Sequence, residues 1–144
     1  MEARRRIVVG LDGSEGSRTA LQWAVEEAVW SGATLVALTT WTALPPPIAY
    51  PYAGVPAQPV GEAHVAALGA LKDMLQPIRD GHPTLSVEPL AVPGDPAKIL
   101  VEQSKEADLV VVGARGHGGI GDWLLGSVSQ NVVQHARCSV AVIR

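Results

Sequence analysis

A cluster of glycines in the last third of the chain is the strongest chemical signal in the sequence. Six glycines stand between Gly113 and Gly126. Glycine lets backbone N–H groups approach a ligand closely and adopt positive φ, so a segment of this kind can wrap an anion. It leads into a predicted helix, whose first N–H groups and dipole favour phosphate. We therefore expect a phosphate site here, with a flexible turn that binds nothing as the alternative.

Polar side chains near the glycines would add donors to such a site. Arg115 and His117 lie within the segment, and the hydroxyls of Ser127 and Ser129 follow it. A carboxylate, Asp12, comes directly after an early apolar run. Taken alone, Asp12 would be interpreted as a helix N-cap or a turn former, because aspartate is favoured in both settings. The glycine segment is what favours a role for Asp12 in ligand binding.

Two well-known phosphate motifs almost match the glycine segment, and both fail. Residues 116–121 fit G-x-G-x-x-G, but the acid expected about 20 residues later is missing, because Val140 and Ala141 stand there. Residues 121–127 resemble a Walker A loop without its lysine. A dinucleotide-binding fingerprint and an efficient P-loop NTPase are therefore not expected.

Elements of alternating type must position these residues. Five short apolar runs are typical of strands, most of them covered on both faces, and amphipathic stretches between them predict helices. The expected strands are residues 7–11, 34–41, 85–92, 108–113 and 139–143. The expected helices are a first one through residues 20–29, then residues 60–80, 96–105 and 125–134.

Glycines and prolines predict several boundaries of these elements. Gly32 is placed to end the first helix as its C-terminal cap. Asp95 followed by Pro96 predicts an N-cap with proline at the first helical position. Pro77 is expected to kink or end the second helix. Pro89 cannot donate a ladder hydrogen bond, so its strand is expected at a sheet edge.

The alternation of strands and helices implies an α/β fold with a parallel sheet covered on both faces. Open sheets of this kind bind ligands at the carboxyl ends of strands, where the strand order reverses. Two of these ends carry polar chemistry, the first with Asp12 and the fourth with the glycines. We expect the site to lie between them.

Composition limits the class of protein. The chain has 144 residues, of which 47% are hydrophobic and 17% are charged, so we expect one folded domain over residues 1–144. A single cysteine, Cys138, excludes disulfide scaffolds and zinc ribbons, and is expected to pack in or beside the core. The histidines show no metal-ligand spacing, so no metal site is predicted. The formal net charge of −3 argues against binding nucleic acid by phosphate neutralisation.

Two segments bear on membranes and mobility. No apolar run reaches membrane-spanning length, and the apolar run after Arg4–Arg6 is too short for a signal peptide, so we expect a cytoplasmic protein. Residues 42–59 hold six of the 11 prolines, which excludes helix and central strand. This proline-rich segment is interpreted either as a mobile functional loop or as an insertion without a task.

The glycine spacing that does fit is Gly113-x2-Gly116-x9-Gly126-Ser127, which resembles the nucleotide-binding signature of the universal stress protein family, in its ATP-binding branch. The resemblance runs along the whole chain. Residues 7–14, Ile-Val-Val-Gly-Leu-Asp-Gly-Ser, resemble the first strand of that family and its ligand-facing aspartate. Gly94-Asp95-Pro96 resembles the start of its third long helix, and residues 139–143 resemble its last strand.

The resemblance implies a Rossmann-like, adenine nucleotide α-hydrolase-like fold, with an open five-stranded parallel sheet of order 3-2-1-4-5. It implies that the Asp12 carboxylate accepts from ribose hydroxyls and that backbone groups near Gly10 and Thr40 contact adenine. Thr39 and Thr40 replace a His-aliphatic pair often seen at this place in the family. The residues that would hold the phosphates are Gly113, Ala114, Arg115, Gly116, His117, Gly118, Gly119, Gly126, Ser127, Val128 and Ser129.

On this basis we expect an ATP-binding regulatory protein of the stress response, with Mg²⁺ held mainly through the phosphates and little or no hydrolysis. One alternative is a slow enzyme that uses the same pocket for phosphoryl or adenylyl transfer. Another is a dimerising module that binds no nucleotide. The strand over residues 139–143 ends at the chain terminus and would be a sheet edge, so a homodimer through it is expected. An unknown regulatory protein is the other expected partner, and neither nucleic acid nor membrane is.

Overall fold

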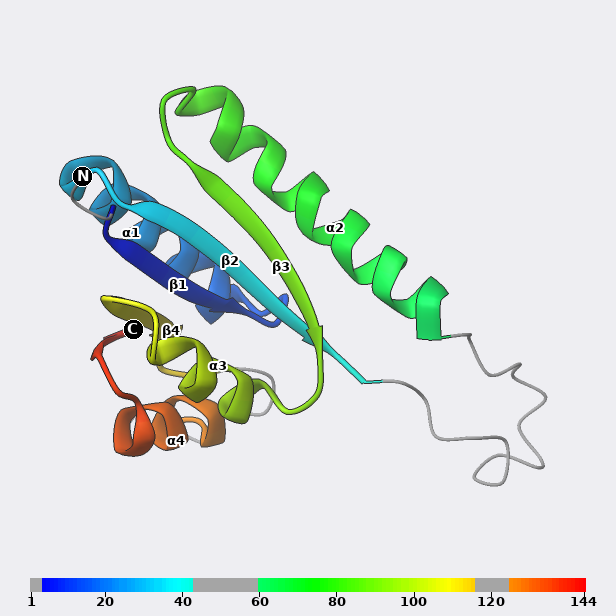
Figure 1. Cartoon of the computed structure of the whole chain (residues 1–144), viewed down its shortest axis with the longest axis vertical. Helices are drawn as coiled ribbons and strands as arrows, with labels where there is room; N and C mark the ends of the chain where they lie inside the picture. The colour runs from blue at the N-terminus through cyan, green and yellow to red at the C-terminus, as the bar shows by residue number, and fades with distance from the viewer. Residues whose placement is uncertain (1–3, 43–59, 116–124) are drawn as a thin grey trace.

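The computed structural model describes residues 4–42, 60–115 and 125–144. Its elements alternate along the chain as β1 (Arg6–Leu11), α1 (Glu15–Ser31), β2 (Thr34–Trp41), α2 (Val60–Gly81), β3 (Val87–Pro93), α3 (Pro96–Ser104), β4 (Leu109–Gly113), α4 (Ser127–His135) and β5 (Ser139–Ile143). The strands form one parallel sheet of order β3-β2-β1-β4-β5 (Figure 1). The predicted architecture and strand order are confirmed.

Each face of the sheet is covered by a pair of helices. α1 and α2 pack on one face, where Ala24, Leu71 and Leu75 join the strand residues in a buried cluster. α3 and α4 pack on the other face, where Leu100 and Val132 are buried against the strands. The middle strands are buried on both faces, which explains their continuous apolar runs.

Most of the predicted boundaries are confirmed. Gly32 ends α1 in the left-handed conformation with φ 70°, and its N–H donates to the Ala28 carbonyl. Asp95 is the N-cap of α3, and its carboxylate accepts from the N–H groups of Ala97 at 2.9 Å and Lys98 at 3.2 Å. β3, which contains Pro89, lies at a sheet edge as predicted.

Three boundaries differ from the sequence-based expectation. The alternative that α2 ends at Pro77 is wrong, because the helix continues to Gly81. Pro77 is exposed there, so water can satisfy the carbonyl that loses its helical donor. β3 begins at Val87 rather than residue 85, because the Leu85 N–H donates to the His82 carbonyl in a turn at 3.0 Å. α4 begins at Ser127 rather than Leu125.

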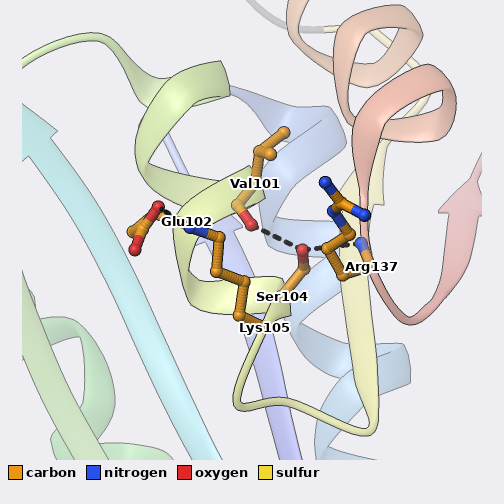
Figure 2. Close-up of polar contacts among 5 residues, drawn as sticks. All are labelled: Val101, Glu102, Ser104, Lys105 and Arg137. Carbon is orange, nitrogen blue, oxygen red and sulfur yellow. Dashed lines mark hydrogen bonds and ion pairs between the residues drawn. The ribbon is translucent and has the colours of Figure 1, made fainter.

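A buried serine joins α3 to the connection between α4 and β5. Ser104, at the end of α3, donates its hydroxyl proton to the Val101 carbonyl at 2.5 Å and accepts from the Arg137 N–H at 2.9 Å (Figure 2). Lys105 next to it pairs with Glu102 on the surface at 2.7 Å. The hydroxyl therefore ties the C-terminal ends of the two helices on this face together.

The proline-rich segment lies almost wholly outside the described residues. None of the helices in the described parts of the chain is long and apolar enough to cross a membrane.

Candidate functional site

The strand order reverses beside β1, which lies between β2 and β4. The last residue of β1, Leu11, is paired with Thr39 of β2, so Asp12 leaves the sheet beside Thr40. On the other side, β4 runs parallel to β1 and ends at Gly113. The carboxyl ends of β1, β2 and β4 therefore bring Asp12, Thr40 and Gly113 to one edge of the sheet, as predicted.

Asp12 is held in a tight turn at this edge. Its Oδ1 accepts from the Ser14 N–H at 2.9 Å and also from the Ser14 hydroxyl. Ser14 in turn is the N-cap of α1, and its Oγ accepts from the Ser17 N–H at 3.2 Å. Asp12 is thus a turn former and Ser14 is the cap. This turn fixes Oδ1 of the carboxylate, and Asp12 is exposed at the carboxyl edge of the sheet.

A second feature of this edge is a close approach of two backbones. A Cβ added to Gly16, in the first turn of α1, would lie 2.5 Å from the Arg115 carbonyl oxygen. A Cβ added to Gly113 would lie 2.9 Å from the Gly16 carbonyl carbon and oxygen. The first turn of α1 therefore sits directly on the chain that leaves β4. Gly113 is needed for this packing, in addition to any role in admitting a ligand.

Hydrogen bonds to the Ala114 carbonyl hold the two ends of the glycine segment together. The Ala114 carbonyl accepts from the Gly126 N–H at 2.7 Å and from the Ser129 hydroxyl at 3.0 Å. The same hydroxyl also lies 3.0 Å from the Gly126 carbonyl. Ser129 is 2% exposed, and its one proton is shared between these carbonyls. Its side chain therefore holds the ends of the segment rather than presenting a donor to a ligand.

The hydrogen bond between Gly126 and Ala114 also explains where α4 begins. Because the Gly126 N–H bonds to Ala114, Gly126 takes an extended conformation with φ −64° and ψ 164° and becomes the N-cap. Glycine has no side chain, so the N-cap residue supplies no oxygen for the first N–H groups of the helix. Ser127 is exposed in this first turn, whereas Val128 packs toward the core. The first turn of α4 therefore has the character of an anion site.

The β2 side of the edge is tied by a threonine. The Thr39 hydroxyl donates to the Leu11 carbonyl at 3.1 Å, which links the ends of β2 and β1 directly before Asp12. Thr40 is half-buried beside it. Gly10 faces α3, and a Cβ there would lie 3.0 Å from Leu100 Cδ1. Thr39 thus supplies a cross-strand hydrogen bond at the end of β2.

The remaining predicted site residues divide into two groups. Arg115 is exposed directly after the buried Ala114. Gly116, His117, Gly118 and Gly119 lie outside the described residues.

Sequence reasoning missed the packing contact of Gly16 and the hydrogen bond of Thr39. The available signal for Gly16 was a glycine within the first turn of a predicted helix, where it costs about 1 kcal/mol relative to alanine. The signal for Thr39 was its departure from the pattern that the sequence otherwise resembles.

The described residues offer little acid, base or metal chemistry. No group of three His, Cys, Asp or Glu side chains gathers in residues 4–42, 60–115 and 125–144. Burial raises the pKa of the Cys138 thiol, the nearby Asp108 raises it further, and a hydrogen bond from the backbone of Val110 opposes them. Cys138 packs against the α3–α4 core cluster, as expected for a small boundary residue.

Comparison with known proteins identifies the family. The model of the universal stress protein family matches residues 3–144. The chain belongs to this family. A universal stress protein of Mycobacterium tuberculosis is 36% identical over 142 residues, which cover 96% of this chain and 44% of the relative. The chain thus spans less than half the length of the curated relatives that it matches.

Solved structures agree with this assignment. The universal stress protein UspA from Lactobacillus plantarum has a TM-score of 0.74 and 26% identity, with 99% of this chain and all of that chain covered. A universal stress protein in complex with cAMP has a TM-score of 0.68 and 30% identity, with 99% and 98% covered. Family members with the same fold at 22% identity were solved with dAMP, from Archaeoglobus fulgidus, and with AMP, from Arabidopsis thaliana.

Proposed function

We propose that this universal stress protein binds ATP at the edge where β1, β2 and β4 end. In this proposal adenine lies against the backbone near Gly10 and Thr40, and ribose hydroxyls donate to Asp12. The phosphates lie against Gly113–Arg115 and the first turn of α4. Mg²⁺ is held mainly through the phosphates. The adenine nucleotides bound by related universal stress proteins support the ligand class.

The observation that carries the proposal is the glycine N-cap of α4. The Ala114 carbonyl holds Gly126 at the same edge as the Asp12 turn. A bound phosphate would supply the oxygen that Gly126 lacks and would gain from the helix dipole. Asp12 stands on the neighbouring strand end, so the site has a carboxylate for hydroxyl groups and backbone N–H groups for an anion.

Binding is tested by two measurements on the purified protein. Mass spectrometry of the denatured sample detects any ATP or ADP that co-purifies. Calorimetry with Mg-ATP should then give one site per chain, with AMP and cAMP as competitors to define the preferred phosphate number. If the folded, nucleotide-free protein binds none of these three nucleotides, the proposal is wrong.

We also propose that ATP is held with little or no hydrolysis. The sequence contains no lysine after Lys105, so the lysine that P-loops direct at the β- and γ-phosphates is absent from the glycine segment and from α4. The site is therefore suited to sensing nucleotide rather than consuming it, and we propose a regulatory role in the stress response, in the cytoplasm, through a protein partner. A steady-state rate above about 1 s⁻¹ would favour the enzyme alternative instead.

A homodimer through β5 completes the proposal. β5 lies at the edge of the sheet and pairs with β4 from Ser139 to Ile143. Its outer backbone groups can pair with a second copy in closed two-fold symmetry. Light scattering at micromolar concentration should show twice the mass of 15.0 kDa. Val142→Asp should yield monomer or insoluble protein, and a monomeric parent protein would contradict the proposal.

A further inference from the structure

Gly16 occupies a place that the phosphate and ribose contacts proposed above do not explain. It lies in the first turn of α1, one turn beyond the Asp12 carboxylate, and its backbone touches the chain that leaves β4. A glycine inside a helix makes the helix less stable than an alanine would, by about 1 kcal/mol. We propose that Gly16 is a positioning residue of the nucleotide site, which sets how far the Asp12 turn stands from the phosphate-binding chain. This inference rests on the proposed ATP site.

The Asp12 side of the contact is a chain of hydrogen bonds. Asp12 Oδ1 accepts from the N–H and hydroxyl of Ser14, and Ser14 Oγ accepts from the N–H of Ser17. The Ser17 hydroxyl also donates back to the Ser14 carbonyl at 2.9 Å, and Ser17 is buried. These bonds fix the Asp12 carboxylate to the first turn of α1. A displacement of that turn therefore displaces the carboxylate with it.

The phosphate side of the contact is equally fixed. Arg115, whose carbonyl faces Gly16, follows Ala114 directly. The Ala114 N–H donates to the Ile143 carbonyl at 2.8 Å, and its own carbonyl accepts from the Gly126 N–H and the Ser129 hydroxyl. The Arg115 backbone is thus joined to the start of α4. Gly16 is the point where the two anchored units meet.

The size of the gap shows why only glycine fits. A Cβ at position 16 would lie 2.5 Å from the Arg115 oxygen, so the two backbones would have to separate by about 0.9 Å to reach the shortest ordinary contact of about 3.4 Å. Neither partner is a side-chain end that could rotate away. A Cβ added to Gly113 would meet the same backbone from the strand side, at 2.9 Å from the Gly16 carbonyl. The separation would enlarge the span between carboxylate and phosphate site.

This geometry predicts an effect that depends on the phosphates of the ligand. Adenosine reaches the adenine and ribose contacts alone, whereas ATP must bridge from Asp12 to the phosphate site. Gly16→Ala should therefore lower the affinity for ATP by at least about tenfold, while the affinity for adenosine changes by no more than about twofold. A general loss of folding stability would weaken both ligands by the same factor.

The experiment compares calorimetric affinities for ATP and adenosine in the wild type, Gly16→Ala and Gly69→Ala. Gly69 is a matched control, since it is also helical and a Cβ there would meet nothing within 4 Å. A selective loss of ATP in Gly16→Ala alone supports the inference, and an unchanged ratio of the two affinities overturns it. Wild-type protein that binds neither ligand overturns the proposed function itself, which is a different result.

A variant that fails to fold is also informative. If Gly16→Ala does not accumulate as folded protein, Gly113→Ala is measured in its place. Its Cβ would force the first turn of α1 away from β4 at the same contact. The added Cβ would point at the Gly16 carbonyl and the Ser17 N–H, so a selective loss of ATP affinity with an unchanged adenosine affinity in that variant reports this contact and supports the inference. Failure of both variants to fold would assign the contact to the folding core rather than to the site, which overturns the inference as well.

Discussion

α3 and α4 share a face of the sheet and each span nine residues, but they begin in different ways. α3 starts with Asp95, whose carboxylate accepts from two N–H groups of its own first turn. α4 starts with Gly126, which supplies no such oxygen. A helix that meets only solvent is stabilised by its own cap, whereas a helix that meets an anion gains by leaving those N–H groups to the ligand. The comparison therefore distinguishes the N-terminus of α3, which is capped by its own side chain, from that of α4, which we propose binds phosphate.

The two helices are also stabilised by a matched pair of buried serines. Ser104 at the end of α3 is 1% exposed and Ser129 in α4 is 2% exposed, and each hydroxyl contacts two backbone groups. Ser104 links the ends of α3 and α4 away from the site. Ser129 links the two ends of the glycine segment at the site. The same kind of hydrogen bonding therefore stabilises the fold at one end and the proposed nucleotide site at the other.

The largest effect is expected when the binding N-terminus is given a cap like that of α3. Gly126→Asp places a carboxylate against the first turn of α4, where the phosphates should bind. Repulsion between the new carboxylate and the phosphates, together with competition for the N–H groups, should lower the affinity for Mg-ATP by about 100-fold or more. Calorimetry at fixed salt measures this effect.

Gly126→Ala is the control for the aspartate variant. The φ of −64° at this position suits alanine, so ATP affinity should remain within a few-fold of the wild type. Gly126→Asp should also have equal or higher thermal stability, because aspartate caps a helix better than glycine does. Undiminished ATP affinity in a folded Gly126→Asp protein would show that the phosphates bind elsewhere.

The serine pair should show the next largest difference. Ser129→Ala leaves the Ala114 carbonyl without one donor and loosens the ends of the glycine segment. It should lower the free energy of unfolding by about 1–3 kcal/mol and lower the affinity for ATP by about tenfold. Ser104→Ala should cost a similar free energy of unfolding and leave ATP affinity unchanged. Denaturant unfolding and calorimetry on both variants test this, and equal losses of affinity would contradict it.

A smaller effect is expected at the structural cap. Asp95→Ala removes the oxygen that accepts from Ala97 and Lys98, so it should lower the free energy of unfolding by about 1 kcal/mol. ATP affinity should not change, because this turn lies at the end of β3, away from the reversal of strand order. A loss of affinity comparable to that of Ser129→Ala would mean that the ligand extends along the edge as far as α3.

Local signals in the sequence were sufficient for most of the fold. Unbroken apolar runs marked buried strands, Pro89 marked an edge strand, and Asp95 with Pro96 marked the start of α3. Each of these depends on a residue and its chain neighbours. The start of α4 was misplaced by two residues because it depends on a hydrogen bond between Gly126 and Ala114. No local pattern reports a contact of that range.

The candidate site divides in the same way. Asp12 and Gly113 were predicted at the carboxyl edge of the sheet because their residue types carry the chemistry, and the structure places both there. The roles of Gly16 and Thr39 were not predicted, because they lie in contacts with Arg115 and Leu11 that only the folded sheet creates. Ser129 was interpreted as a phosphate donor because a serine after a glycine segment suggests one. Its burial and its two carbonyl partners assign it a supporting role instead.

The smallest effect is expected at the far end of α4, where Cys138 precedes β5. Because burial raises the pKa of this thiol, its thiolate fraction at pH 8 should be below that of a free cysteine. Alkylation by iodoacetamide should therefore be slower than that of glutathione, and its rate should still be rising with pH where the glutathione rate levels off. Cys138 lies at the amino edge of the sheet, whereas ATP is expected at the carboxyl edge, so saturating Mg-ATP should change the rate by less than about twofold. Strong protection by ATP would show that the ligand acts along the whole length of α4, and the contrast between its two ends would then have to be abandoned.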